Sequence, residues 1–318
     1  MIGSAIVTRD LVKRRGKRRA LDGLSLSVPR GSILGLVGEN GAGKTTWMMT
    51  VAGFLRPDSG EIDILGMGPF DAERHAGRIS ILPQDSELPL ESTPMGALYR
   101  FGRLQGLSPN AARKSAHDAL TAVNLLDRAN ATVRTLSHGM RKRAMVAQCF
   151  VGNPEIVLLD EPLNGLDPVE ADRLRRFIAS QRGRRTVVVS SHNLEDVERL
   201  CTHVAVVGKG RLARMDTVAA ITHGTDRIVY TLSSAPKDIE ALSAVVPGTV
   251  LEWRDGGRTL VCSLGSDMGG IAELNRRLLP ALLAQTDIIS VMPGQSLEEA
   301  FLIAKDVEPG DKLQKRQA

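Results

Sequence analysis

Short apolar runs recur along roughly the first 215 residues, and glycine or polar residues bound each of them. Runs of this length with β-branched members predict buried strands. They lie at Ile33–Val37, Ile79–Leu82, Ile156–Leu159, Thr186–Val189 and Val204–Val207. Segments between them have helical patterns, as in Thr45–Phe54, Ala111–Leu126 and Glu170–Ser180. Strands that alternate with helices indicate a largely parallel sheet with helices on both faces.

Two stretches of this first part depart from the alternation. Residues 1–30 carry short β-like runs around a basic turn. The stretch at about 86–135 has little strand signal, and we expect it to be a mostly helical insertion. The sequence therefore predicts a first domain at 1–215 that contains this helical subdomain.

The pattern changes after about Arg214, where alternating segments surround shorter helical ones. Strands are predicted at Arg227–Leu232, Val250–Trp253, Leu260–Leu264 and Asp287–Met292. Helices are predicted at Ile239–Val245, Ile271–Leu283 and Ser296–Lys305. Asp255-Gly256-Gly257 fits a hairpin turn between two of the strands. We expect a small α+β domain at 216–306 and a frayed polar tail at 307–318.

The composition narrows the class of protein. Hydrophobic residues at 42% and charged residues at 24% exclude a disordered chain. Aromatic residues at 3% leave little material for a nucleic-acid stacking platform. No apolar stretch approaches the roughly 20 residues that a membrane-spanning helix needs, and the N-terminus lacks the layout of a secretory signal. We expect a soluble chain that reaches a membrane only through a partner.

The cysteines and the charge add two smaller points. Cys149, Cys201 and Cys262 show no metal-type or redox-type spacing, and the first two lie in apolar stretches typical of a core. A reducing cytoplasm fits this usage. The net charge of +5 includes a basic run at Lys13–Arg19. That run is either a solvated hairpin tip or a grip for nucleic acid, a membrane surface or phosphates.

A glycine-rich segment follows the first predicted strand and opens a predicted helix. It matches the Gly-x-x-x-x-Gly-Lys-Ser/Thr pattern of a phosphate-binding loop. Its glycines let backbone N–H groups point at phosphate oxygens, and the following helix presents the positive end of its dipole. Lys44 is placed to reach the β- and γ-phosphates, and Thr45 to offer its hydroxyl to Mg²⁺. The expected nucleotide-binding residues are Gly38, Glu39, Asn40, Gly41, Ala42, Gly43, Lys44, Thr45 and Thr46.

Polar residues follow three other predicted strands. Asp160 and Glu161 end the strand at Ile156–Leu159, at the sheet edge where the phosphates would lie. Asp160 is the expected Mg²⁺ ligand, and Glu161 the general base that polarises the attacking water. His192 is placed to contact the γ-phosphate. Gln84 is placed to touch Mg²⁺ or the water, with its amide as donor and acceptor.

The order of these features resembles the ABC (ATP-binding cassette) ATPase family. The phosphate loop and Gln84 are followed by a signature-like segment, Leu136-Ser137-His138-Gly139-Met140. Glu161 then leads into a segment similar to the family's D-loop, which ends at Asp167, and His192 matches the family's switch histidine. The resemblance covers about residues 1–215. It implies a P-loop NTPase fold of the ABC type, with a RecA-like parallel core, an antiparallel N-terminal part and a helical subdomain.

The same resemblance implies a mechanism. Two ATPase subunits would sandwich two ATP molecules, with Ser137 and Gly139 of one subunit on the γ-phosphate held by the other. Free N–H groups at a helix start after Ser137 favour such an anion. Asp167 is implied in the nucleotide site as well. A separately encoded membrane permease would use the motion, with the ATPase bound to it on the cytoplasmic side of the membrane, and no nucleic-acid partner is expected.

This chain departs from the commonest family pattern at two places. His138-Gly139-Met140 replaces Gly-Gly-Gln, a variant that resembles the ATPases of bacterial drug and polysaccharide exporters. Arg15 stands where many members have an aromatic residue against adenine, and it either stacks through its guanidinium or leaves the base more weakly held. The segment Gln295–Leu302 is similar to the C-terminal extension of those exporter ATPases, and an amphipathic helix is expected there.

Two other functions stay open at this stage. A non-transport ABC ATPase that acts on nucleic acid or the ribosome would have the basic run as its support. A degenerate cassette that binds ATP without hydrolysis would lack catalytic residues, yet Lys44, Asp160, Glu161 and His192 are all present. The sequence therefore favours an ATP-hydrolysing subunit of an exporter.

Overall fold

The computed structural model describes residues 3–222, 227–264 and 269–293. The chain divides into two compact units, Met1–Met215 and Asp216–Ala318, and each is described by itself. Among the described residues, no helix has the length and apolar character needed to cross a membrane.

The first unit is built on a six-stranded sheet. Its order is β5 (Ile79–Leu82), β6 (Ile156–Asp160), β7 (Thr186–Ser191), β3 (Ile33–Val37), β8 (His203–Gly208) and β9 (Arg211–Thr217). The pairs β5–β6, β6–β7, β3–β7 and β3–β8 are all parallel. Every residue of β3, β6 and β7 is buried, as expected for central strands covered on both faces.

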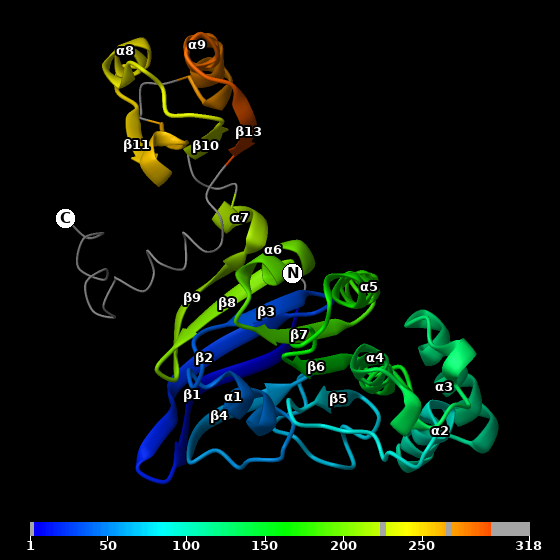
Figure 1. Ribbon diagram of the computed structural model, residues 1–318. Helices are drawn as coiled ribbons and strands as arrows, with labels where there is room; N and C mark the ends of the chain where they lie inside the picture. The colour runs from blue at the N-terminus through cyan, green and yellow to red at the C-terminus, as the bar shows by residue number, and fades with distance from the viewer. Residues whose placement is uncertain (1–2, 223–226, 265–268, 294–318) are drawn as a thin grey trace. The chain divides into compact units, whose positions relative to one another are not determined.

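A second, antiparallel sheet of order β2–β1–β4 lies beside the first (Figure 1). Its strands are β1 (Ser4–Arg15), β2 (Arg18–Pro29) and β4 (Ser59–Ile64). Helix α1 (Lys44–Val51) packs between the two sheets, because Trp47 and Met48 share one apolar core with residues of both. The Trp47 indole Nε1 donates to Thr8 Oγ1 of β1 at 3.2 Å, which satisfies the one polar atom of this buried ring.

A helical part lies to one side of the parallel sheet (Figure 1). It contains α2 (Pro94–Leu104), α3 (Pro109–Ala122), the 3₁₀ turns η1 (Leu126–Arg128) and η2 (Val133–Thr135), and α4 (His138–Gln148). These elements bury an apolar cluster of their own. Helix α4 leads back to β6, and β6 is followed by α5 (Pro168–Ala179). Helix α6 (Leu194–Leu200) follows β7.

The second unit begins with α7 (Val218–Thr222) and contains an antiparallel sheet with two larger helices. The strand order is β11 (Val250–Arg254), β12 (Thr259–Ser263), β10 (Arg227–Leu232) and β13 (Ile288–Pro293). Helices α8 (Ile239–Val245) and α9 (Ile271–Leu283) share its apolar core. The turn η3 (Asp255–Gly257) joins β11 to β12, where a hairpin turn was predicted.

The predicted fold class is confirmed, with corrections at helix ends. The helix predicted at Ala111–Leu126 stops at Ala122, because Asn124 has a left-handed backbone with φ of 59°. The helix predicted at Thr45–Phe54 stops at Val51, before Gly53 with φ of 79°. Cys149 and Cys201 are buried as expected. The predicted helix at Ser296–Lys305 and the tail at 307–318 lie outside the described residues.

Candidate active site

The phosphate loop joins β3 to α1, and its shape requires glycine at two points. A Cβ on Gly38 would lie 2.3 Å from the carbonyl oxygen of Val207, and one on Gly43 would lie 2.6 Å from that of Ala20. Gly43 also caps α1 with φ of 111°, a conformation that other residues rarely adopt. The backbones of two neighbouring strands therefore hold the loop closely on both sides.

Lys44 opens α1 and turns its side chain back into the loop. Its Nζ donates to the carbonyl oxygens of Gly38 at 2.6 Å and Glu39 at 3.3 Å. Burial lowers the pKa of Lys44, while the nearby carboxylates of Glu161 and Asp160 raise it. The ammonium group thus lies inside the loop, within electrostatic reach of the acids at the end of β6.

Strand order brings those acids to the same edge of the sheet as the loop. β7 lies between β3 and β6, and all three are parallel, so their carboxyl ends meet. Ser190, at the end of β7, is fully buried. Its Oγ donates a short hydrogen bond to Asp160 Oδ1 and accepts one from the backbone N–H of Glu161 at 2.9 Å. One hydroxyl therefore joins the carboxyl ends of β6 and β7.

Glu161 and His192 meet just beyond these strands. His192 Nδ1 lies 3.0 Å from Glu161 Oε2, the distance at which a protonated ring nitrogen donates to a carboxylate. The Glu161 side chain is 9% exposed and that of His192 57%, so the pair extends from the interior to the surface. Glu161 has φ of 48°, a left-handed backbone at the point where the strand turns. Asn193 caps α6 directly after His192.

The surroundings of Asp160 fit a divalent cation. Asp160 Oδ2 is buried and has no hydrogen-bond partner among the residues that the structure describes. An unpartnered carboxylate oxygen beside a phosphate loop is the kind of ligand that Mg²⁺ prefers. Thr45 is half-buried and follows Lys44 in α1. Gln84 is exposed, just after β5, which pairs with β6.

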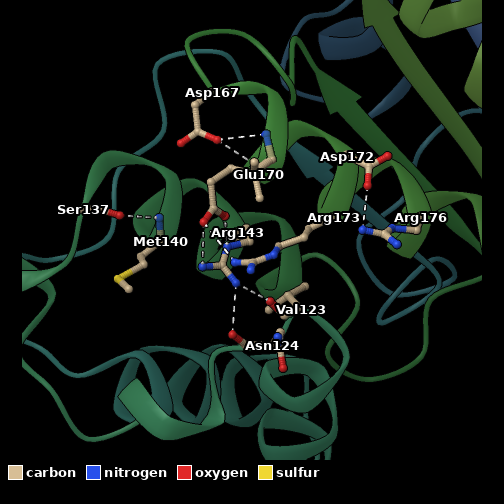
Figure 2. A network of polar contacts seen from close by, with 11 residues as sticks. Val123, Asn124, Ser137, Met140, Arg143, Asp167, Glu170, Asp172, Arg173 and Arg176 are labelled. Carbon is tan, nitrogen blue, oxygen red and sulfur yellow. Dashed lines mark hydrogen bonds and ion pairs between the residues drawn. The ribbon is translucent and has the colours of Figure 1, made fainter.

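Three predicted nucleotide residues lie at the starts of α4 and α5, and Figure 2 shows two of them, Ser137 and Asp167. Ser137 is exposed and caps α4, and its Oγ accepts from Met140 N at 3.1 Å. Gly139 follows in the first turn. Asp167 is exposed and caps α5, accepting from the N–H groups of Val169 and Glu170. Ser137 and Asp167 thus place exposed side chains at the two helix starts.

Arg15 lies at the tip of the β1–β2 hairpin, paired in register with Arg18. Arg15 is exposed. Arg18 is the residue that reaches the phosphate loop, because its Nη2 donates to Gly41 O at 2.9 Å. Sequence reasoning chose Arg15 from its place before Gly16. A strand pairing with two arginines opposite each other would have indicated Arg18 as an equal candidate.

Two further residues near the site were missed. Ser190 was seen only as the polar end of a buried strand, and nothing in the sequence shows that it reaches the neighbouring strand. Lys142 of α4 is buried, and burial lowers its pKa while Asp160, Glu161 and Asp85 raise it. The sequence shows only a lysine near the signature segment, and this position does not indicate which way its side chain points.

Comparisons with known proteins agree with this geometry. The family model described as "ABC transporter" matches residues 21–164. The Nod factor export ATP-binding protein I of Ralstonia nicotianae is 35% identical over 308 residues, which are 92% of this chain and 91% of that relative. A daunorubicin resistance ATP-binding protein of Streptomyces coeruleorubidus is 35% identical over 313 residues, 95% of this chain and 96% of that protein.

Solved structures support the fold. A dimeric ATP-binding cassette in a post-hydrolysis state, bound to ADP and Pi, superposes with a TM-score of 0.61 at 21% identity. That match covers 67% of this chain and 98% of the other. The cbiO1 protein of Clostridium perfringens, part of a transporter complex, gives a TM-score of 0.62 at 23% identity over 69% of this chain and 90% of its own.

The expected resemblance to exporter-type relatives is confirmed, since the two relatives of nearly full coverage carry export and drug-resistance names. Two observations now point to the same family. One is the similarity over almost the whole chain, and the other is the order of the phosphate loop, the acids at the end of β6 and the histidine. The chain therefore belongs to the ATP-binding proteins of the ABC transporter family, and it is an ATPase.

Proposed function

We propose that this ATPase binds to a separately encoded membrane permease, closes on a second cassette around two ATP molecules, and drives export. The observation that carries the catalytic part is the contact of His192 with the buried Glu161 carboxylate at 3.0 Å. This acid lies at the sheet edge beside the phosphate loop. The permease and the direction of transport rest on the relatives.

The phosphate loop supplies the binding of the triphosphate. Backbone N–H groups of residues 38–46 and the start of α1 face the β- and γ-phosphates. The Lys44 ammonium exchanges its carbonyl partners for phosphate oxygens. The exchange is favourable because burial destabilises the charged ammonium, and a nearby anion stabilises it again. On the hairpin, Arg15 stacks on the base and Arg18 approaches the phosphates over Gly41.

Magnesium would be held by the Thr45 hydroxyl, the free Oδ2 of Asp160 and the Gln84 side chain. When bound, Mg²⁺ neutralises charge on the β- and γ-phosphate oxygens. Ser190 keeps Oδ2 available, since it occupies the other oxygen of Asp160.

Hydrolysis then depends on Glu161 as the base. Its carboxylate polarises a water for attack on the γ-phosphorus, and Gln84 orients that water. His192 holds the carboxylate in place through Nδ1 and senses the γ-phosphate from the exposed side. Because the Glu161 backbone is bonded to Ser190, the base is fixed relative to the strand that precedes His192.

The second subunit completes the site through the starts of α4 and α5. Both helix starts carry exposed residues, and the first N–H groups of α4, those of His138 and Gly139, suit an anion presented by another chain. Ser137 and Gly139 contact the γ-phosphate of the partner's ATP, and Asp167 lies at the same interface. A dimer also occurs among the solved cassettes of this fold.

The decisive experiment is Glu161→Gln in the full chain. We expect turnover to fall at least about a hundredfold, while ATP-dependent dimers accumulate in size-exclusion chromatography. Lys44→Ala is the matched variant that loses binding, so it forms no dimers with ATP. Turnover near the wild-type rate in Glu161→Gln would show that another group is the base.

The permease proposal needs a separate test. Co-expression with the membrane protein of the neighbouring reading frame and solubilisation in detergent should recover a complex that contains both chains. We expect cargo of drug-like, lipid or polysaccharide type. A neighbour without membrane spans, or a failure to associate, would argue against transport.

The nucleic-acid alternative has weak support in the structure. Within the basic run, Lys13 Nζ bonds Asp58 and the carbonyl of Arg56, and Arg19 pairs with Asp22. Arg18 is turned to the phosphate loop. Three of the six charged side chains of the run thus have partners inside the molecule, which weakens the run as a grip for phosphates outside it. Salt-sensitive binding of DNA or RNA by the purified chain would revive this function.

A further inference from the structure

Arg143 of α4 lies at the centre of a polar network that joins three helices (Figure 2). The residue is 3% exposed. Its Nη1 donates to the carbonyl oxygens of Val123 at 2.7 Å and Asn124 at 3.0 Å, at the end of α3. These carbonyls have no helical partner, so the guanidinium closes the end of that helix.

On its other side, the same guanidinium meets Glu170 of α5. Arg143 Nε lies 2.5 Å from Glu170 Oε2 as an ion pair, and Nη2 donates to Oε1 at 3.4 Å. The first contact is an ion pair without hydrogen-bond geometry, since neither Nε nor Oε2 has a hydrogen-bond partner among the described residues, and the second is a long hydrogen bond. The Glu170 side chain is 16% exposed, so the pair is screened little by water. We call Arg143 and Glu170 the clamp.

The clamp joins the signature segment to the loop before α5. A Cβ on Gly139 would lie 3.0 Å from Glu170 Cγ, so the signature backbone rests directly on the Glu170 side chain. A Cβ on Gly165 would lie 3.3 Å from His138 Nε2. The N–H of Glu170 is bonded to Asp167 at 2.9 Å. Three points thus tie the residues that face a partner's ATP to the loop that follows Glu161.

We propose that Arg143 and Glu170 are positioning residues that make the signature segment and the loop at 162–167 move as one body. Docking of the partner's ATP on Ser137 and Gly139 then fixes the loop and, through it, the carboxylate of Glu161 in the chain's own site. The two ATP sites are coupled through this ion pair. The inference rests on the two-subunit site proposed above.

The test uses the full chain with Glu170→Gln and with the double change Arg143→Gln and Glu170→Gln. The first leaves a buried cation without its partner. The double variant is neutral and keeps its folded state if the single one does not. Asp172→Asn is the matched control, because it removes a carboxylate on the same helix that pairs at the surface with Arg175 and Arg176.

Three quantities are measured for each variant. They are the affinity for a fluorescent ATP analogue, the ATP concentration that half-saturates dimer formation in a Glu161→Gln background, and the turnover rate with Glu161 intact. With the clamp removed, we expect the first two to stay within about threefold and turnover to fall about tenfold or more. The Asp172→Asn control should change all three by less than about twofold.

Two results would overturn the proposal. One is unchanged turnover in the neutral double variant. The other is an equal loss of analogue binding, dimers and turnover, which a purely structural role predicts. The two-subunit site is tested separately by the Glu161→Gln variant with an intact clamp. If that variant forms no ATP-dependent dimer, the two-subunit site fails, whatever the clamp does.

Discussion

At the scale of single residues, the hydroxyl of Ser190 holds two parts of the site together. Ser190 Oγ bonds Asp160 Oδ1 and the backbone of Glu161, and it is fully buried. The sequence predicts Asp160, Glu161 and His192 at one sheet edge, because parallel strands end together, and the structure places His192 Nδ1 3.0 Å from Glu161 Oε2. The sequence could not predict Ser190 as their link, because which strand neighbours which is a property of the fold.

Ser190→Ala should separate binding from turnover. The variant leaves the Glu161 N–H buried without a partner, at a cost of about 1–3 kcal/mol of unfolding free energy. We expect turnover to fall about tenfold, since the base loses its anchor, while ATP affinity in the absence of Mg²⁺ is retained. Chemical denaturation and steady-state ATPase assays give both values. Ser191→Ala is the control, because the Ser191 hydroxyl bonds, within the described part of the chain, the backbone of Asn193 alone.

At the scale of elements, predictions were good for strands and poorer for helix ends. Strands β3, β5 and β6 fall within a residue of their predicted bounds. The bounds are predictable because the apolar residues of a buried strand stop at the point where the chain leaves the core. Helix α3 stops earlier than its apolar spacing indicates, because Asn124 takes a left-handed turn and Arg143 closes the helix end. That closure comes from another helix, so local pattern carries no sign of it.

The phosphate loop gives a prediction at this scale. Gly43→Ala should reduce ATP affinity at least about tenfold, because a methyl group at this left-handed position meets the carbonyl of Ala20. The strain should cost about 1–3 kcal/mol of stability. Equilibrium binding of a fluorescent nucleotide and thermal unfolding measure the two effects. Gly208→Ala, with open space around it, should leave both unchanged.

At the scale of the whole molecule, the change of pattern near Arg214 coincides with the division of the structure at Met215 and Asp216. The first unit has its own cores, and the second closes another around Tyr230, whose hydroxyl donates to Asn275. The sequence pattern predicts a change there because alternating strands replace fully apolar ones. In the second unit the sequence offers the exporter-like segment Gln295–Leu302, which implies the family and not a role of its own.

Buried thiols report on each unit separately. Burial raises the pKa of Cys149 and of Cys262 from 9.0 to about 12, and that of Cys201 further. We expect no reaction with a thiol reagent at pH 8 in the folded chain. In rising denaturant, Cys262 reports opening of the second unit, and Cys149 with Cys201 that of the first. Fast labelling of the native chain would contradict this burial.

The same thiols set a pH dependence of stability. Above about pH 9 the unfolded chain loses thiol protons that the folded chain keeps until about pH 12. The unfolded state then binds fewer protons, so the free energy of unfolding falls as pH rises through this window. Substituting Cys149 by Ala should flatten that decline, measured by denaturation at pH 8 and pH 10.

The left-handed backbone of Glu161 sets ATP turnover against the free energy of unfolding at one position. A glutamate with φ of 48° and a buried carboxylate lowers the stability of the folded state, through backbone strain and through burial of a charge. Glu161→Asn, which tolerates this conformation, should raise the free energy of unfolding by about 1 kcal/mol while turnover disappears. Thermal unfolding in the absence of nucleotide measures the gain. Directed evolution for heat resistance alone would therefore tend to discard the base, and a screen must score ATP hydrolysis to keep it.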